Sequence, residues 1–267
     1  MPDRVVDLAA QHATPALLAV RDWLLVALSF STGIYEGICF LTFGKVFSAA
    51  QTGNLVLLGI GLRTPEPAGP NAVTVVIAVA AFASGAMLAI PILKTFDGDL
   101  GTEDNKVFQV WPRRVSIALA IALILQAGFL AVWATTASPA TLAYPLMALS
   151  AFAMGLQMNA IRSLHVPGIS VTAFTATFAD LASGIAKWSL TEPAVRRLAG
   201  TVVAMPAGAL LGDWMLSQMH RYAPVVPMIV IAVVISVASV ALKPQGPSLA
   251  GRRGFPLQQV VRENLPD

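Results

Sequence analysis

The sequence contains few of the residues from which soluble enzymes and metal sites are built. Only 12% of its 267 residues are charged, about half the share found in an average soluble domain. Cys39 is the single cysteine, which excludes a disulfide within the chain and a site made of several thiolates. The three histidines, His12, His165 and His220, are far apart in the sequence. We therefore expect no resident metal and no cofactor.

Motifs for covalent catalysis and for phosphate binding are also missing. The chain has neither a Gly-x-Ser-x-Gly sequence nor a phosphate-binding loop. Ala83-Ser84-Gly85 faintly resembles the site of an intramembrane serine protease, but no histidine inside an apolar run could serve as its base. The net charge of +3 is spread over the ends of apolar runs, so no nucleic-acid partner is expected. The sequence therefore does not favour an enzyme.

What the sequence does contain is a series of apolar runs of about 20 residues, the length that crosses a bilayer. Between the longer runs lie two shorter and more polar runs, 46–62 and 169–187. The six longer runs are 23–43, 72–94, 115–136, 141–161, 199–219 and 223–242. We therefore predict an all-α integral membrane protein whose main partner is the lipid bilayer.

The two halves of the chain share one layout. Each half has a glycine-containing apolar run, a short break, a small polar cluster and a second apolar run. Gly33 and Gly155 are 122 residues apart, and Gly85 and Gly208 are 123 residues apart. A membrane chain built from two such halves usually places its working site where the halves meet.

The distribution of Lys and Arg decides between two topologies, because cytoplasmic loops carry the excess of positive charge. If both short runs enter the membrane and return on the same side, 14 of the 17 cations lie on one side and only Lys45, Arg63 and Arg221 on the other. If all eight runs cross, ten lie on one side and seven on the other. We therefore predict about six full transmembrane helices and two short broken or re-entrant helices, arranged as two inverted repeats. Eight crossings are the alternative.

This topology divides the chain into four regions. They are a cytoplasmic N-terminal segment (1–22), a first membrane repeat (23–136), a second membrane repeat (137–243) and a disordered cytoplasmic tail (244–267). The first repeat includes a polar loop, 95–114. The N-terminus has no compact apolar region of the secretory type. The charge distribution and the even number of crossings together predict that both termini lie in the cytoplasm.

Several motifs in the two halves form one recognisable pattern. The first half carries Gly33-Ile34-Tyr35-Glu36-Gly37, Phe43-Gly44-x-Val46-Phe47, Thr52-Gly53-Asn54 and Leu58-Gly59. The second half carries Met154-Gly155-Leu156-Gln157, Arg162 and Ser170-Val171-Thr172-Ala173-Phe174-Thr175-Ala176-Thr177. With these motifs the chain resembles the YoaK-like family of bacterial multi-spanning membrane proteins over about residues 25–240. The resemblance implies a bacterial inner-membrane location and brings no reaction, ligand or catalytic residue.

Glu36 is the leading candidate for a functional side chain. A lone carboxylate well inside an apolar run is costly and tends to be functional. It could carry a proton, bind a cation or hold a positively charged group of a substrate. The alternative is a packing residue that is protonated or paired with Lys45 or Arg162.

Two polar clusters at the breaks supply further candidates for ligand or ion binding. The first cluster can form a ligand site, a helix cap or both, and consists of Gln51, Thr52, Gly53 and Asn54. The second cluster can line a path or join helices by hydrogen bonds, and consists of Thr172, Thr175, Thr177 and Asp180. Asp180 could also face Glu36 across the repeat axis.

Gln157 and Asn159 are the remaining candidates, near the end of the run 141–161. Because they lie on different sides of a helix, at most one of them is expected to face a cavity. Gly208-x-x-x-Gly212 matches a motif for close helix packing and leaves a homo-oligomer open.

These features favour a transporter or channel for an unknown small solute or for protons, with its site between the two repeats near the midplane. Proton coupling through Glu36 is the mechanism that the buried carboxylate suggests. A membrane scaffold or partner subunit and an intramembrane enzyme are the alternatives.

Overall fold

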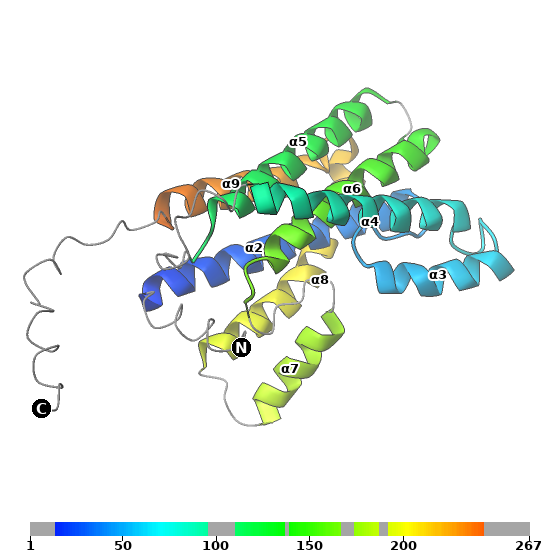
Figure 1. Ribbon diagram of the computed structural model, residues 1–267. Helices are drawn as coiled ribbons and strands as arrows, with labels where there is room; N and C mark the ends of the chain where they lie inside the picture. The colour runs from blue at the N-terminus through cyan, green and yellow to red at the C-terminus, as the bar shows by residue number, and fades with distance from the viewer. Residues whose placement is uncertain (1–13, 96–109, 137–138, 167–173, 187–191, 243–267) are drawn as a thin grey trace, which may run out of the picture.

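The computed structural model describes residues 14–95, 110–136, 139–166, 174–186 and 192–242. Within these residues, all regular secondary structure is helical (Figure 1). The α-helices are α2 (Pro15–Thr42), α3 (Gln51–Arg63), α4 (Ala72–Thr95), α5 (Arg113–Thr135), α6 (Ala143–Arg162), α7 (Phe174–Ala186), α8 (Pro193–Met219) and α9 (Val225–Ala241). The 3-10 helices are η2 (Pro139–Leu142) and η3 (His220–Tyr222). The predicted all-α fold class is confirmed.

Helix lengths separate long helices from short ones. In the described residues, α2, α4, α5 and the continuous stretch of α8 and η3 are long and apolar enough to cross a membrane. α6 has 20 residues, and α9 is a shorter apolar helix of 17 residues. α3 and α7 have 13 residues each, about 20 Å, which is too short for a hydrocarbon core of about 30 Å. The two short runs thus form short helices, as predicted.

α2 begins earlier than the sequence predicted. It starts at Pro15, inside the segment 1–22 that was expected to precede the first repeat. Proline suits the first turn of a helix, where an N–H group has no partner in any case. The charged residues that marked the predicted boundary are accommodated by pairing, since Arg197 Nη1 of α8 lies 3.1 Å from Asp22 Oδ2. α2 thus extends into the segment 1–22, and the division of the chain into four regions stays a prediction. The tail 244–267 lies outside the described residues.

α2 packs along α8 at positions where glycines let the two backbones touch. A Cβ atom at Gly33 would overlap the carbonyl oxygen of Met205, and one at Gly208 would overlap that of Phe30. Gly212 also faces the backbone of α2. The motif Gly208-x-x-x-Gly212 is therefore used inside the chain, and a contact between subunits is not needed to explain it.

α4 packs along α6 in the same way. A Cβ at Gly85 would overlap the carbonyl oxygen of Phe152, and one at Gly155 would overlap that of Phe82. Further contacts between elements join α5 to α6, α9 to α2 and to α5, α3 to α4 and α7 to α8. Figure 1 shows the long helices as one bundle, with α3 and α7 each beside a long helix.

The buried core fixes the relative directions of the helices. One cluster joins the beginnings of α2 and α5 to the ends of α4, α6 and α9, through Leu25, Leu119, Ala89, Ile161 and Ala238. A second cluster joins the ends of α2 and α5 to the beginnings of α4 and α6. α2 and α4 therefore run in opposite directions although α3 lies between them in the chain. α3 thus does not act as a full crossing between them, which favours six crossings over eight.

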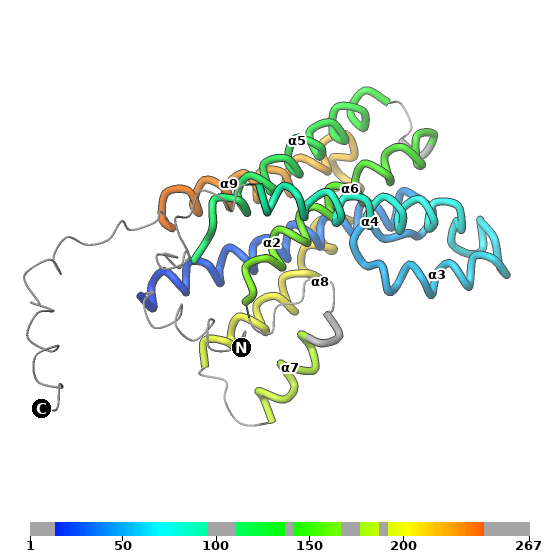
Figure 2. Tube along the Cα trace, viewed as in Figure 1, coloured from blue at the N-terminus to red at the C-terminus, as the bar shows by residue number. Residues whose placement is uncertain are grey.

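The segment that contains α3 begins and ends at neighbouring points of the bundle, just after α2 and just before α4. Figure 2 traces it from α2 into α3 and back to α4. The N–H of Asn71, just before α4, donates to the carbonyl of Gly44, just after α2, at 3.0 Å. That the site lies between the two repeats near the midplane stays a prediction.

Candidate functional site

Glu36 lies on the buried face of α2, with only 3% of its surface exposed. Its Oε1 accepts hydrogen bonds from Ser48 Oγ and from the N–H of Ala49, both at 2.6 Å. Among the described residues, its other oxygen, Oε2, has no hydrogen-bond partner. Glu36 is therefore half satisfied. Its Oε1 is held by the non-helical segment 43–50 between α2 and α3, which we call the break, and its Oε2 is available to a proton or a ligand.

Neither of the cations expected as a partner of Glu36 pairs with it. The Lys45 side chain is exposed, and Nζ donates to the carbonyl of Ala68 at 3.2 Å. Arg162 is exposed at the end of α6 and lines a separate cavity. The carboxylate is instead held by neutral donors at the beginning of α3. The positive end of a helix dipole also lies there and favours a negative charge.

Asn54 fixes the backbone of the break by hydrogen bonds from its side chain. Its Oδ1 accepts from the N–H of Phe47 at 3.0 Å, and its Nδ2 donates to the carbonyl of Phe47 at 2.7 Å. Gln51 supports the same segment, because its Nε2 donates to the carbonyl of Ser48 at 2.9 Å. The side chains of the first predicted cluster therefore position Ser48 and the N–H of Ala49 against Glu36.

The other two members of the first cluster do not reach Glu36. Thr52 is exposed on α3. A Cβ at Gly53 would lie 3.5 Å from the ring of Phe47, an ordinary contact distance, so no close backbone approach requires glycine there. The structure thus divides the predicted cluster into two residues that hold the break and two that do not.

Further buried polar groups lie on the helices around Glu36. Within the described part of the chain, Tyr35 Oη, both amide atoms of Gln126 and Gln157 Oε1 have no hydrogen-bond partner. Gln157 Nε2 is 3.5 Å from Thr32 Oγ1, at the limit of a hydrogen bond. Each buried unpaired group costs about 1–3 kcal/mol. Buried polar atoms without a partner thus lie on α2, α5 and α6, in the same bundle interior that holds Glu36.

Gln126 was not predicted as a site residue, although the sequence carried a signal for it. It is the single polar side chain in the otherwise apolar stretch 121–130 of α5, and it is fully buried. A lone polar residue inside a membrane span is a candidate by the same reasoning that selected Glu36. Ser48 carried no such signal, because only the folded break brings it to the carboxylate.

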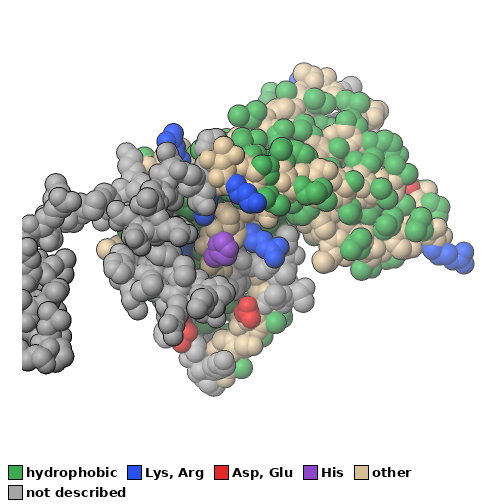
Figure 3. All heavy atoms as spheres, viewed as in Figure 1, with side chains coloured by type: hydrophobic (Ala, Val, Ile, Leu, Met, Phe, Trp, Pro, Cys, Tyr) green, Lys and Arg blue, Asp and Glu red, His purple; other side chains and the backbone are tan. Residues whose placement is uncertain are grey.

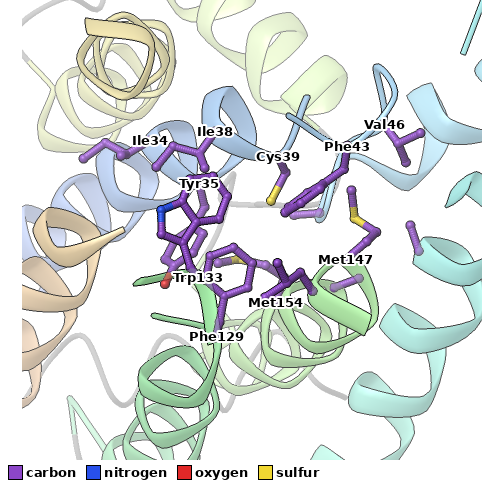
Figure 4. Packing of buried hydrophobic residues seen from close by; sticks show 14 of the residues in the cluster. Ile34, Tyr35, Ile38, Cys39, Phe43, Val46, Phe129, Trp133, Met147 and Met154 are labelled. Atoms are coloured by element: carbon purple, nitrogen blue, oxygen red, sulfur yellow. The ribbon is translucent and has the colours of Figure 1, made fainter. Parts of the chain in front are cut away.

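Aromatic side chains pack together in the core near the ends of α2 and α5 (Figure 4). The Tyr35 ring packs edge-on against Phe129, with ring centroids 5.9 Å apart. Phe129 stacks on Trp133 at 5.6 Å, and Phe43 packs edge-on against both rings. Trp133 is anchored in turn by its Nε1–H, which donates to the carbonyl of His220. These rings form an aromatic layer at the ends of α2 and α5.

The second predicted cluster is only partly described. Thr172 lies outside the described residues, and Thr175 lies on α7. Thr177 is buried and Asp180 is exposed on the same helix, which packs on α8. Because Asp180 is exposed and Glu36 is buried, the structure gives no support to the expected approach of the two carboxylates.

Gln157 and Asn159 point to different neighbours, as their positions on a helix predict. Gln157 is buried beside Thr32 of α2. Asn159 instead faces α4, where its Nδ2 donates to the carbonyl of Ala86. No three His, Cys, Asp or Glu side chains gather as a metal site in the described ranges.

Comparisons with known proteins agree with the membrane-spanning lengths of these helices. The family profile described as "Protein of unknown function (DUF1275)" matches residues 24–237. The chain is 28% identical over 236 residues to the UPF0700 transmembrane protein YoaK of Bacillus subtilis (strain 168). The aligned region covers 84% of this chain and 96% of that protein. No solved structure matches. The resemblance to YoaK-like proteins is confirmed, and the chain is a membrane protein that belongs to the DUF1275 family of unknown function.

Proposed function

We propose that this protein transports a small solute across the bacterial inner membrane and that Glu36 couples the transport to protons. The observation that carries the proposal is the half-satisfied carboxylate of Glu36 inside the bundle. Its Oε2 is buried without a hydrogen-bond partner among the described residues, and the bundle interior holds further unpaired polar atoms on α2, α5 and α6. A buried carboxylate in a membrane span is typical of proton relays in transporters. The buried phenol of Tyr35 and the buried amides of Gln126 and Gln157 could form hydrogen bonds with polar atoms of a solute.

The hydrogen bonds of Glu36 define where a proton would be held. Oε1 already accepts two short hydrogen bonds, so a proton would be carried on Oε2. Protonation would make Oε1 a weaker acceptor and loosen its hold on Ser48 and Ala49. The break before α3 would then move more freely. Proton occupancy and the position of the re-entrant segment would thus be linked.

The packing of the helices supports an inverted-repeat transporter. The contact of α2 with α8 has its counterpart in the contact of α6 with α4, and the glycines at these contacts are related by the spacing of 122 or 123 residues. The beginning of α2 shares a core cluster with the end of α6, so these two helices run in opposite directions. Inverted repeats with broken helices are a common transporter architecture.

A flux assay tests the proposal. The full chain is reconstituted in vesicles that contain a pH-sensitive dye, and solutes are screened for uptake that acidifies the interior. We expect Glu36→Gln to reduce solute-dependent proton uptake by about a hundredfold or more, because the amide cannot carry the proton. Asp213→Asn, at an exposed carboxylate of α8, is the matched control and should leave uptake unchanged.

The stability of the variants separates coupling from a structural role. Glu36→Gln keeps an oxygen that can accept from Ser48 and Ala49, so its unfolding temperature in detergent should stay close to that of the unmodified chain. Glu36→Ala leaves both donors buried and unpaired and should unfold at a lower temperature. Proton-coupled uptake that survives in a folded Glu36→Gln protein would overturn the proposal.

A further inference from the structure

A second polar site lies at the other end of the bundle from the aromatic layer. The ends of α4 and α6 and the beginning of α5 surround a cavity of about 450 Å³. Its lining residues are Ile90, Leu93, Lys94, Arg114, Asn159, Arg162, Ser163 and His165. Three of them carry a permanent positive charge, and no Asp or Glu is among the lining residues that the structure describes. Figure 3 shows Lys and Arg side chains beside a histidine on one face of the molecule.

The neutral polar groups of this cavity have donors that are already engaged. Asn159 Nδ2 donates to the carbonyl of Ala86, and Ser163 Oγ donates to the carbonyl of Ala160 at 2.7 Å. His165 Nδ1 lies 2.9 Å from the carbonyl of Ser163, so Nδ1 carries the proton and Nε2 is the nitrogen left for the cavity. The attraction for a ligand therefore comes from the three cations, which would favour an anion.

We infer that this cavity binds a phosphate group, held by Lys94, Arg114 and Arg162. Arg presents a planar fork that matches phosphate oxygens, and Lys adds a compact charge. The apolar wall formed by Ile90 and Leu93 points to the phosphate of an anionic phospholipid. Basic pockets between helix ends at the membrane surface commonly hold such head groups.

The apolar face next to the cavity supports the lipid as the source of the phosphate. Met87, Leu88 and Ile90 are exposed on α4, directly before the cationic end of that helix. Acyl chains could lie along this face while the phosphate reaches Lys94. The inference does not depend on the proposed transport, because none of the residues that hold Glu36 lines this cavity.

Lipid binding to the full chain in detergent tests the inference by native mass spectrometry. Phosphatidylglycerol and phosphatidylcholine are added in turn to the unmodified protein and to the variant Lys94→Gln/Arg162→Gln. With about a fivefold effect for each cation, the Kd for phosphatidylglycerol should rise about 25-fold in the variant, and that for phosphatidylcholine should hardly change. Arg63→Gln/Arg221→Gln removes two exposed cations elsewhere and is the matched control.

A second arm distinguishes lipid from free phosphate. The unfolding temperature of each protein is measured with inorganic phosphate and with sodium chloride of the same ionic strength. In one outcome, phosphate stabilises the unmodified protein but not the cavity variant, while the cavity variant and the control variant bind lipid equally. This outcome would show that the cavity binds phosphate and would overturn the inference that the phosphate comes from a lipid. If neither ligand distinguishes the cavity variant from the control, the inference is wrong. Should the double variant fail to fold, the exposed Lys94→Gln change alone decides in the same assays.

Discussion

Single residues of one type have different roles in this protein, and its glycines show this clearly. Gly33 is buried where α2 crosses α8, and the carbonyl of Met205 occupies the place that a side chain would need. Gly53 lies in the first turns of α3 with only the Phe47 ring at ordinary contact distance. Both glycines belong to the motifs shared with YoaK-like proteins, yet only Gly33 is required by packing.

Alanine substitutions should separate these two glycines. Gly33→Ala forces α2 and α8 apart, and we expect destabilisation by at least the 1–3 kcal/mol typical of an overpacked core. Gly53→Ala should be neutral or stabilising by up to about 1 kcal/mol, because alanine is the better helix former. The yield of folded protein and its unfolding temperature in detergent measure both effects. Equal losses for the two variants would contradict this assignment.

At the scale of elements, the break before α3 is the unit on which the proposed site depends. Asn54 binds both backbone groups of Phe47, and the ordered break then presents Ser48 and Ala49 to Glu36. Asn71 has a similar local role at the next helix, where its Oδ1 accepts from the N–H of Thr74 at the beginning of α4. The two asparagines therefore hold backbone groups at two different places.

Hydrogen exchange should show which backbone segment each of these two asparagines holds. In Asn54→Ala the N–H of Phe47 loses its acceptor, so we expect it to exchange about tenfold faster or more, together with its neighbours up to residue 50. In Asn71→Ala the faster exchange should be confined to the first turn of α4. If Asn54→Ala leaves the exchange of residues 46–50 unchanged, Asn54 does not hold the break.

At the scale of the whole molecule, the direction of each helix decides the topology. The core clusters place the beginning of α2 at the same end of the bundle as the ends of α4, α6 and α9. With the N-terminus in the cytoplasm, six crossings then place the loop before α4 outside and the beginning of α5 inside. Eight crossings would reverse both positions.

Single introduced cysteines test this topology in intact spheroplasts. Cys39 is fully buried, so the unmodified chain should give little background with a membrane-impermeant maleimide. Ala68→Cys lies in the exposed turn after α3 and should be labelled from outside. Arg113→Cys at the exposed beginning of α5 should be labelled only after permeabilisation. The reverse pattern would overturn six crossings with a cytoplasmic N-terminus.

The fold class, the short length of two helices and the spacing of the repeated glycines could all be predicted from the amino-acid sequence. These properties follow from each segment's own composition, because burial of an apolar run in a bilayer depends on its length and its charges. The isolation of Glu36 within an apolar run likewise marked it as a candidate without knowledge of its neighbours.

The neighbours of each polar side chain, in contrast, follow from how the helices pack in three dimensions. Ser48 meets Glu36 because the break folds back on α2, and Gln126 belongs to the same interior because α5 packs beside α6. The same packing leaves Thr52 and Asp180 exposed and assigns Asn159 to the cationic cavity. Hydropathy along the chain cannot specify such choices, because they depend on close contacts between segments that are distant in the sequence.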